Sequence, residues 1–251
     1  MIPISIQLYT LREQNKQDFP AMLRMLAETG YTGVEYAGLY GHSAQEIASL
    51  VGDLGLVSSS AHAALPSKDN IGELTDTYKT LGVKTLVSGF GGADFETEDA
   101  VRRSAARFQE AAQIAEAAGF EFGIHNHEWE FKPLADGRIP YDLLMEHAPG
   151  IYGELDVYWA QFGGSNPAEV VKRYQPRMRL LHIKDGNLTP DRVMTAVGSG
   201  KLDIPAIVGA AAPSVTKWLV VELDACATDM VQAVKDSYKY LTSTGLASGN
   251  K

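Results

Sequence analysis

Ionisable side chains recur where short apolar segments of this sequence end. These side chains are Glu35, His62, His125, His127, Glu154, Asp156, His182, Lys184 and Glu222. Residues two apart on an extended segment share a face, so His125 points with His127 and His182 with Lys184. Carboxylates and imidazoles that converge in a partly desolvated space are costly unless a cation neutralises them. A donor set of nitrogen and oxygen without thiolate favours Mn²⁺, Mg²⁺, Co²⁺ or Zn²⁺.

The apolar segments that carry these side chains alternate with stretches of helical periodicity. Strands are predicted over Ile4–Leu8, Gly33–Ala37, Val57–Ala61, Thr85–Ser88, Phe120–His125, Tyr152–Asp156, Leu180–Lys184 and Trp218–Leu223. The clearest helix is predicted over Glu98–Ala118, where Val101, Ala105 and Phe108 fall on one apolar stripe. Glycines follow several predicted helices, at Gly30, Gly55, Gly82 and Gly119, where a residue with positive φ ends a helix well. This alternation predicts eight βα units and a parallel sheet.

The sheet could be open or closed, and two features favour a closed barrel. Eight units in 251 residues match the usual size of a (β/α)8 TIM barrel. The first predicted strand runs into Tyr9, with no GxGxxG turn that would support a dinucleotide-binding sheet. We therefore predict an α/β fold with one TIM-barrel domain over residues 1–251, in which residues 242–251 form a frayed tail. The active site of such a barrel lies at the C-terminal ends of its strands.

Composition and charge narrow the classes of partner. The formal net charge of −9 opposes binding to a nucleic-acid backbone, and no local basic patch overrides it. No apolar run approaches the roughly 20 residues that span a bilayer. The lone Cys226 excludes an internal disulfide and suits a reducing compartment, so we expect a cytoplasmic protein. The oligomeric state stays open, a homo-oligomer included.

Five motifs in order carry a family resemblance. They are HNHEWEF (125–131), ELDVYWAQFGG (154–164), LLHIKDG (180–186), VGSGKLDI (197–204) and VVELD (220–224). The earlier segments IQLYTLRE (6–13), GYTGVEYAG (30–38) and SAHAAL (60–65) agree with them. Together they resemble the xylose-isomerase-like TIM-barrel superfamily, specifically its sugar phosphate isomerase/epimerase group, related to ketose 3-epimerases and inosose dehydratases. The likeness covers nearly the whole chain and leaves the substrate open.

The resemblance implies one divalent ion bound by four side chains. Three of them match Asp156, His182 and Glu222, which end the sixth, seventh and eighth predicted strands. Many relatives supply the fourth from a Glu at the end of the fifth strand, where this chain has His125-Asn126-His127. We expect Glu130 to take that place, in preference to His127.

The resemblance also implies how the site acts on a substrate. Glu130 and Glu222 would exchange a proton with opposite faces of a substrate carbon, and Lys184 or His62 would donate to the oxyanion of the enediolate. The remaining expected substrate contacts are Tyr9, Glu35, His125, His127, Trp129 and Trp159.

The implied function is a metal-dependent isomerase or epimerase of carbohydrate metabolism, acting on a small sugar or polyol-derived ketone. If the enediolate expelled a β-hydroxyl or a glycosidic oxygen, the enzyme would be a dehydratase or lyase acting on an inosose or 3-keto-glycoside. Remote alternatives are a non-catalytic sugar-binding barrel and an endonuclease IV type DNA repair enzyme, whose three zinc ions need more ligands than six histidines readily provide. No glycine-rich anion cradle stands out in the late loops, although Gly198-Ser199-Gly200 could serve as one, and we expect an unphosphorylated polyol or sugar as substrate.

Overall fold

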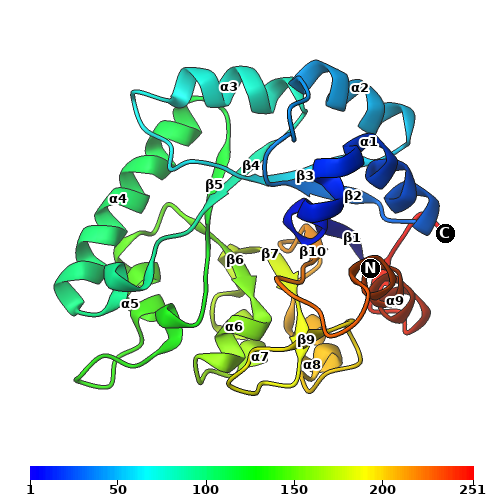
Figure 1. Ribbon diagram of the computed structural model, residues 1–251. Coiled ribbons are helices and arrows are strands. Elements are labelled where there is room, and N and C mark those ends of the chain that lie inside the picture. Colours follow the sequence, from blue (N-terminus) through cyan, green and yellow to red (C-terminus); the bar gives the residue numbers. More distant parts are fainter.

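Eight parallel strands close into a barrel at the centre of the molecule, and helices surround it (Figure 1). The computed structural model describes residues 1–251. The barrel strands are β1 (Ile2–Gln7), β2 (Gly33–Tyr36), β3 (Val57–His62), β4 (Thr85–Ser88), β5 (Glu121–His125), β6 (Tyr152–Asp156), β7 (Met178–Ile183) and β10 (Trp218–Val221). Parallel pairing of β10 with β1 closes the ring. The predicted (β/α)8 barrel is confirmed, and the predicted strands differ from the observed ones by at most two residues at either end.

Helices connect the strands and pack their apolar faces on the barrel. They are α1 (Arg12–Thr29), α2 (Ala44–Asp53), α3 (Ile71–Thr80), α4 (Glu98–Ala117), α5 (Pro140–His147), α6 (Val157–Phe162), α7 (Pro167–Arg173), α8 (Ile204–Ala210) and α9 (Met230–Ser243). The Thr97 hydroxyl caps α4, and its predicted stripe, Val101, Ala105 and Phe108 included, is buried. The four glycines predicted to follow helices all have positive φ. No helix combines the length and apolar character needed to cross a bilayer.

Short elements after the strands shape the C-terminal end of the barrel. Three of these are 3₁₀ turns: η1 (Leu8–Leu11) after β1, η2 (Gly92–Phe95) after β4 and η3 (Trp129–Phe131) after β5. A fourth, η4 (Gln175–Arg177), lies before β7. The loop after β7 contains a two-stranded antiparallel hairpin of β8 (Asp185–Gly186) and β9 (Met194–Thr195). Apart from η4, these elements lie at the end of the barrel where the side chains that follow the strands gather.

The last ten residues are not the frayed tail that the sequence suggested. Helix α9 continues to Ser243, and strand β11 (Ala247–Ser248) pairs in parallel with the start of β1. The backbone N–H of Asn250 donates to the carbonyl of Gly30 over 2.8 Å, and Ala247 is buried. The tail is ordered because the edge of β1 satisfies its backbone polar groups.

Gly163, after α6, packs against the loop that follows β5. A Cβ at this position would lie 2.5 Å from the carbonyl oxygen of Glu128 and 2.6 Å from Cβ of Phe131. Because backbone cannot move aside cheaply, we expect Gly163→Ala to lower the free energy of unfolding by about 1–3 kcal/mol in urea denaturation. Gly52→Ala is the control, because Gly52 lies in α2 with open space around its Cα, and we expect it to be neutral or stabilising. Equal stability of Gly163→Ala and the wild type would contradict this packing.

Candidate metal and substrate site

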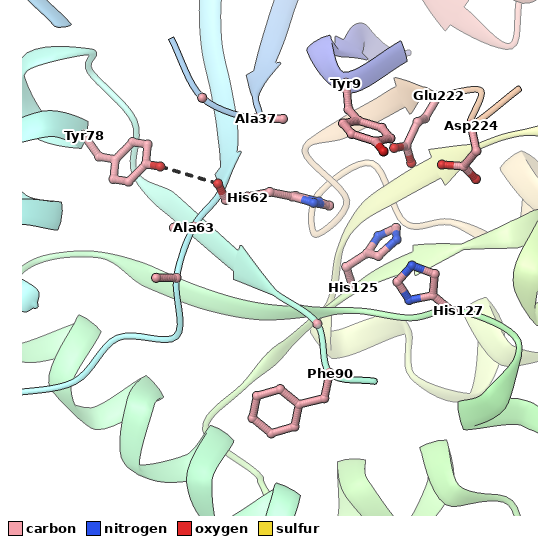
Figure 2. Close-up of a pocket in the computed structure, with 13 residues that line it drawn as sticks. Tyr9, Ala37, His62, Ala63, Tyr78, Phe90, His125, His127, Glu222 and Asp224 are labelled. Carbon is pink, nitrogen blue, oxygen red and sulfur yellow. Dashed lines mark hydrogen bonds between the residues drawn. The ribbon is translucent and has the colours of Figure 1, made fainter. Parts of the chain in front are cut away.

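A pocket of about 710 Å³ opens at the C-terminal ends of the strands. Its polar lining consists of Tyr9, His62, His125, His127, Glu222 and Asp224. The rest of the lining is small or aromatic: Ala37, Gly38, Ala63, Ala64, Gly89, Tyr78 and Phe90. Figure 2 shows His62 at the end of β3, His125 and His127 at the end of β5, and Glu222 after β10, all directed toward the same space. Strand ends far apart in the sequence thus build one site, as expected for this fold.

Three imidazoles meet the carboxylate of Glu154 at the base of this pocket. Glu154 Oε2 lies 2.6 Å from Nε2 of His62, 3.1 Å from Nδ1 of His125 and 3.2 Å from Nε2 of His182. Strand register explains part of the cluster, because His125 on β5 lies opposite Glu154 on β6. Glu35 from β2 joins it, with Oε1 2.7 Å from Nε2 of His182.

A second set of contacts lies around Lys184, which follows β7. Its ammonium lies 2.9 Å from Asp156 Oδ2, 2.9 Å from Glu222 Oε2 and 2.7 Å from Asp224 Oδ2. Glu222 Oε2 also lies 2.6 Å from Nδ1 of His182. Lys184 is buried and held by three carboxylates, so it does not line the pocket as a free substrate donor.

Burial and neighbouring charges shift the pKa values of the carboxylates in opposite directions. Burial raises the pKa of Glu35 to about 7, with Glu154 adding to the effect, and raises that of Asp156 to about 6 against the opposing ammonium of Lys184. Burial alone would raise the pKa of Glu222 too, but Lys184 and His182 hold it well below its usual value. The site therefore mixes carboxyl groups that titrate between about pH 6 and 7 with others that stay ionised at lower pH.

The pKa values of the imidazoles also shift in opposite directions. Burial disfavours the charged form of His182, but Glu154, Glu35 and Glu222 hold its pKa well above the usual range. Burial lowers the pKa of His127 to about 4, so this ring is neutral at pH 7.

Four of these side chains have the donor set and spacing that suit one metal ion. Single donor atoms of His125, Asp156, His182 and Glu222 all lie within 4.8 Å of one another, and the four side chains are buried. Two imidazole nitrogens and two carboxylate oxygens suit a borderline divalent ion. Asp156 Oδ2 accepts no hydrogen bond here, although it lies near the Lys184 ammonium. A buried carboxylate oxygen of this kind fits a metal ligand.

The structure places Glu130 outside this set, and His125 stands where Glu130 was expected. Glu130 lies in η3, is fully buried and accepts a hydrogen bond from the backbone N–H of His127 over 2.9 Å. Burial raises the pKa of its carboxyl well above the usual value. The 3₁₀ turn places Glu130 away from these four donors, while His125 is the last residue of β5, and Glu130 as a metal ligand stays a prediction. His127 lines the pocket but is not among the four donors His125, Asp156, His182 and Glu222.

The aromatic residues expected at the site lie around the pocket. The ring of His127 stacks on Trp129 with a centroid distance of 4.4 Å, and Trp129 Nε1 donates to the carbonyl of Phe90. Trp159 is buried, and its Nε1 donates to Asp224 over 3.2 Å. Tyr9 lines the opening and is 44% exposed, which leaves its ring accessible to a ligand. Of the expected aromatic contacts, Tyr9 alone lies in the pocket lining, and the two tryptophans support it from behind.

Two central residues were not assigned a role from the sequence. Glu154 lies two residues before Asp156 on β6 and therefore points to the same face, a signal that the sequence contains. Asp224 lies two residues after Glu222, beyond the end of β10, so strand periodicity does not place its side chain. Only the fold brings Asp224 to Lys184 and to the pocket wall.

A family model described as a xylose isomerase-like TIM barrel matches residues 23–244. No curated protein matches the sequence. A solved structure described as a sugar phosphate isomerase/epimerase from Parabacteroides distasonis is 28% identical, covers 98% of this chain and 96% of its own, and gives a TM-score of 0.82.

More distant structures share the fold. An L-ribulose 3-epimerase is 18% identical over 98% of this chain and 95% of its own, with a TM-score of 0.70. An IolI protein with a bound zinc atom is 17% identical over 97% of this chain and 99% of its own, with a TM-score of 0.72. At these identities the likeness concerns the architecture alone.

Proposed function

Since the chain belongs to the xylose isomerase-like TIM-barrel family, we propose that it is a divalent-metal-dependent isomerase or epimerase of a small sugar or polyol-derived ketone. The observation that carries this proposal is the buried group of His125, Asp156, His182 and Glu222 at the base of an open pocket. The name of the Parabacteroides relative, at 28% identity, agrees with the proposed class of reaction.

His125, Asp156, His182 and Glu222 would hold the metal. A divalent ion bound there supplies Lewis acidity, which makes a C–H bond next to a substrate carbonyl easier to ionise. Lys184 keeps Asp156 and Glu222 oriented by ion pairing, and Glu154 orients His125 and His182 from below. Such outer contacts fix the tautomer and direction of each ligand.

Glu222 is the proposed proton acceptor, because it is the one carboxylate that belongs to the metal group and also lines the pocket. Its low pKa keeps it ionised at neutral pH. His62 projects from β3 into the same space, and the partners Glu154 and Glu35 raise the pKa of its imidazole against the effect of burial. His62 is therefore the proposed donor to the substrate oxygen, where negative charge develops in the enediolate.

Exchange of substrate hydrogen with solvent tests this function. The manganese-loaded protein would be incubated in deuterated water with ketohexoses, ketopentoses and inososes, and the products followed by NMR. We expect deuterium to enter next to the carbonyl while the carbon skeleton is retained. Loss of water from the substrate would instead identify a dehydratase that uses the same site. Absence of exchange with every ketone and every divalent metal would refute the proposal.

Metal binding is expected to weaken as the pH falls from 7 to 5. Asp156, with its pKa raised to about 6, must lose its proton before it can bind an ion, so protons compete with the metal below that pH. The apparent affinity should fall by about tenfold per pH unit for each proton displaced. Calorimetric titration of chelator-stripped protein with Mn²⁺ measures both the affinity and the protons released. Asp156→Asn should bind more weakly and with a shallower pH dependence, and an unchanged wild-type affinity between pH 5 and 7 would contradict the assignment.

A further inference from the structure

None of the 22 lysines and arginines of the chain lines the pocket. The charged side chains that do line it, apart from histidines, are the carboxylates of Glu222 and Asp224. Of the histidines, His62 and His125 already face Glu154, and His127 packs against Trp129. A phosphorylated substrate would therefore find no lysine or arginine in the lining to pair with its dianion.

Three cations that contact residues of the site are engaged by acceptors within the protein, and a fourth, Arg107, packs over the ring of Phe90 at 4.1 Å from its centroid. Lys184 is surrounded by three carboxylates. Arg12 donates to the backbone carbonyls of Tyr9 and Asp224, and Arg192 pairs with Glu128 over 2.5 Å. A phosphate would have to displace these partners before it gained a charged contact.

TIM barrels often bind phosphate in the loop that follows the seventh strand of the barrel. In this chain the carboxylate of Asp185 accepts the hydrogen bonds of that loop instead. The backbone N–H groups of Gly198 and Gly200 each donate to Asp185 Oδ2 over 3.0 Å. The N–H groups of Gly186 and Leu202 donate to Oδ1 over 2.8 Å and 3.1 Å. Asp185 is buried, and a Cβ on Gly200 would collide with its carboxylate. The glycine cradle that the sequence offered for an anion is therefore filled by the protein's own side chain.

Carboxylates also occupy the helix N-termini that follow the late strands. Asp156 accepts from the N–H of Trp159 at the start of α6, over 2.9 Å. Asp203 caps α8 over 3.0 Å, and Asp229 caps α9 over 2.8 Å. Helix N-termini bind phosphate through N–H groups of the first turn. At these three helices a carboxylate of the protein already accepts from such a group.

We infer that the site takes uncharged sugars and discriminates against their phosphate esters. This inference rests on the proposed function and names the substrate class of the same site. Phe90 and Tyr9 offer aromatic surface for the C–H face of a sugar ring, and the surrounding imidazoles and carboxylates offer partners for hydroxyl groups. The carboxylate of Asp185 is assigned the place that a phosphate would take. Its four hydrogen bonds hold the loop after β7 in one conformation.

Matched substrate pairs test the inference on the manganese-loaded protein. The exchange assay would compare D-fructose with D-fructose 6-phosphate and D-ribulose with D-ribulose 5-phosphate, and calorimetry would measure binding of inorganic phosphate. We expect kcat/KM to be at least about 100-fold higher for the neutral member of each pair that reacts. Inorganic phosphate should show no binding with a Kd below about 1 mM.

Ala64→Lys provides the complementary variant, because Ala64 is exposed and lines the pocket. The added ammonium should raise the turnover of the phosphate ester relative to the neutral sugar by about tenfold. Ala64→Met controls for side-chain size and should leave that ratio near its wild-type value. A ratio that Ala64→Lys does not change would show that charge is not what excludes phosphate, and would overturn the inference.

The remaining outcomes separate the inference from the proposed function. Preferred turnover of the phosphate esters, or tight binding of inorganic phosphate, would overturn the inference while the isomerase function stands. If no neutral sugar or phosphate ester exchanged with any divalent metal, the proposed function would fail, and the inference that the site takes uncharged sugars would fail with it.

Discussion

Glu222→Gln is expected to lose bound metal and turnover together while the barrel stays folded. The side chain is 4% exposed, belongs to the four-donor group and lines the pocket, so it serves both as ligand and as proposed proton acceptor. Glutamine keeps the shape but removes the negative charge and the basic oxygen. We expect metal affinity to fall by at least about 100-fold and kcat by at least about 1,000-fold. Elemental analysis of the purified variant and the exchange assay measure the two losses separately.

Two further variants sharpen this experiment. His182→Ala removes another member of the same group and should lose metal as well, whereas Glu110→Gln changes an exposed glutamate on α4 and should retain both metal and activity. Circular dichroism checks that each variant is folded. Full turnover by Glu222→Gln or His182→Ala in chelator-treated buffer would refute the metal-dependent mechanism.

The barrel was predictable from the sequence because its determinants are local and repeated. Each strand reads as a short apolar segment, and each of Gly30, Gly55, Gly82 and Gly119 has the positive φ that closes the element before it. The tail was not predictable in this way. Its small and polar residues have no periodicity, and their order comes from pairing with the distant β1.

The candidate site was predictable where a side chain ends a strand. Asp156 is the last residue of β6, and it lies opposite His182 on β7 in the sheet register. His125 is likewise the last residue of β5, so the same rule would have selected it over Glu130. Glu130 lies beyond the strand in a 3₁₀ turn, where side-chain direction depends on turn geometry rather than on the period of two.

Lys184→Met should lower the free energy of unfolding of the metal-free protein by more than Gly163→Ala does. The lysine is 1% exposed, and its ammonium lies within 2.9 Å of carboxylate oxygens of Asp156, Glu222 and Asp224. Methionine fills a similar volume but leaves these carboxylates without their cation, and removing one partner of a buried ion pair costs about 3–5 kcal/mol. Urea denaturation in chelator-treated buffer should show this decrease in the free energy of unfolding.

The same variant separates the electrostatic role of Lys184 from simple packing. A divalent ion held by Asp156 and Glu222 supplies positive charge to the carboxylates that the substitution leaves unpaired, so added Mn²⁺ should restore part of the lost stability. A variant that had lost packing alone would gain from Mn²⁺ only the stabilisation that the wild type gains, so a larger gain by Lys184→Met identifies the electrostatic part. Lys235→Met, at an exposed position on α9, should change stability by less than about 0.5 kcal/mol with or without Mn²⁺. If Lys184→Met were as stable as the wild type without metal, the ion pairs of Lys184 with these carboxylates would contribute no net stability, and the electrostatic role assigned to Lys184 would be wrong.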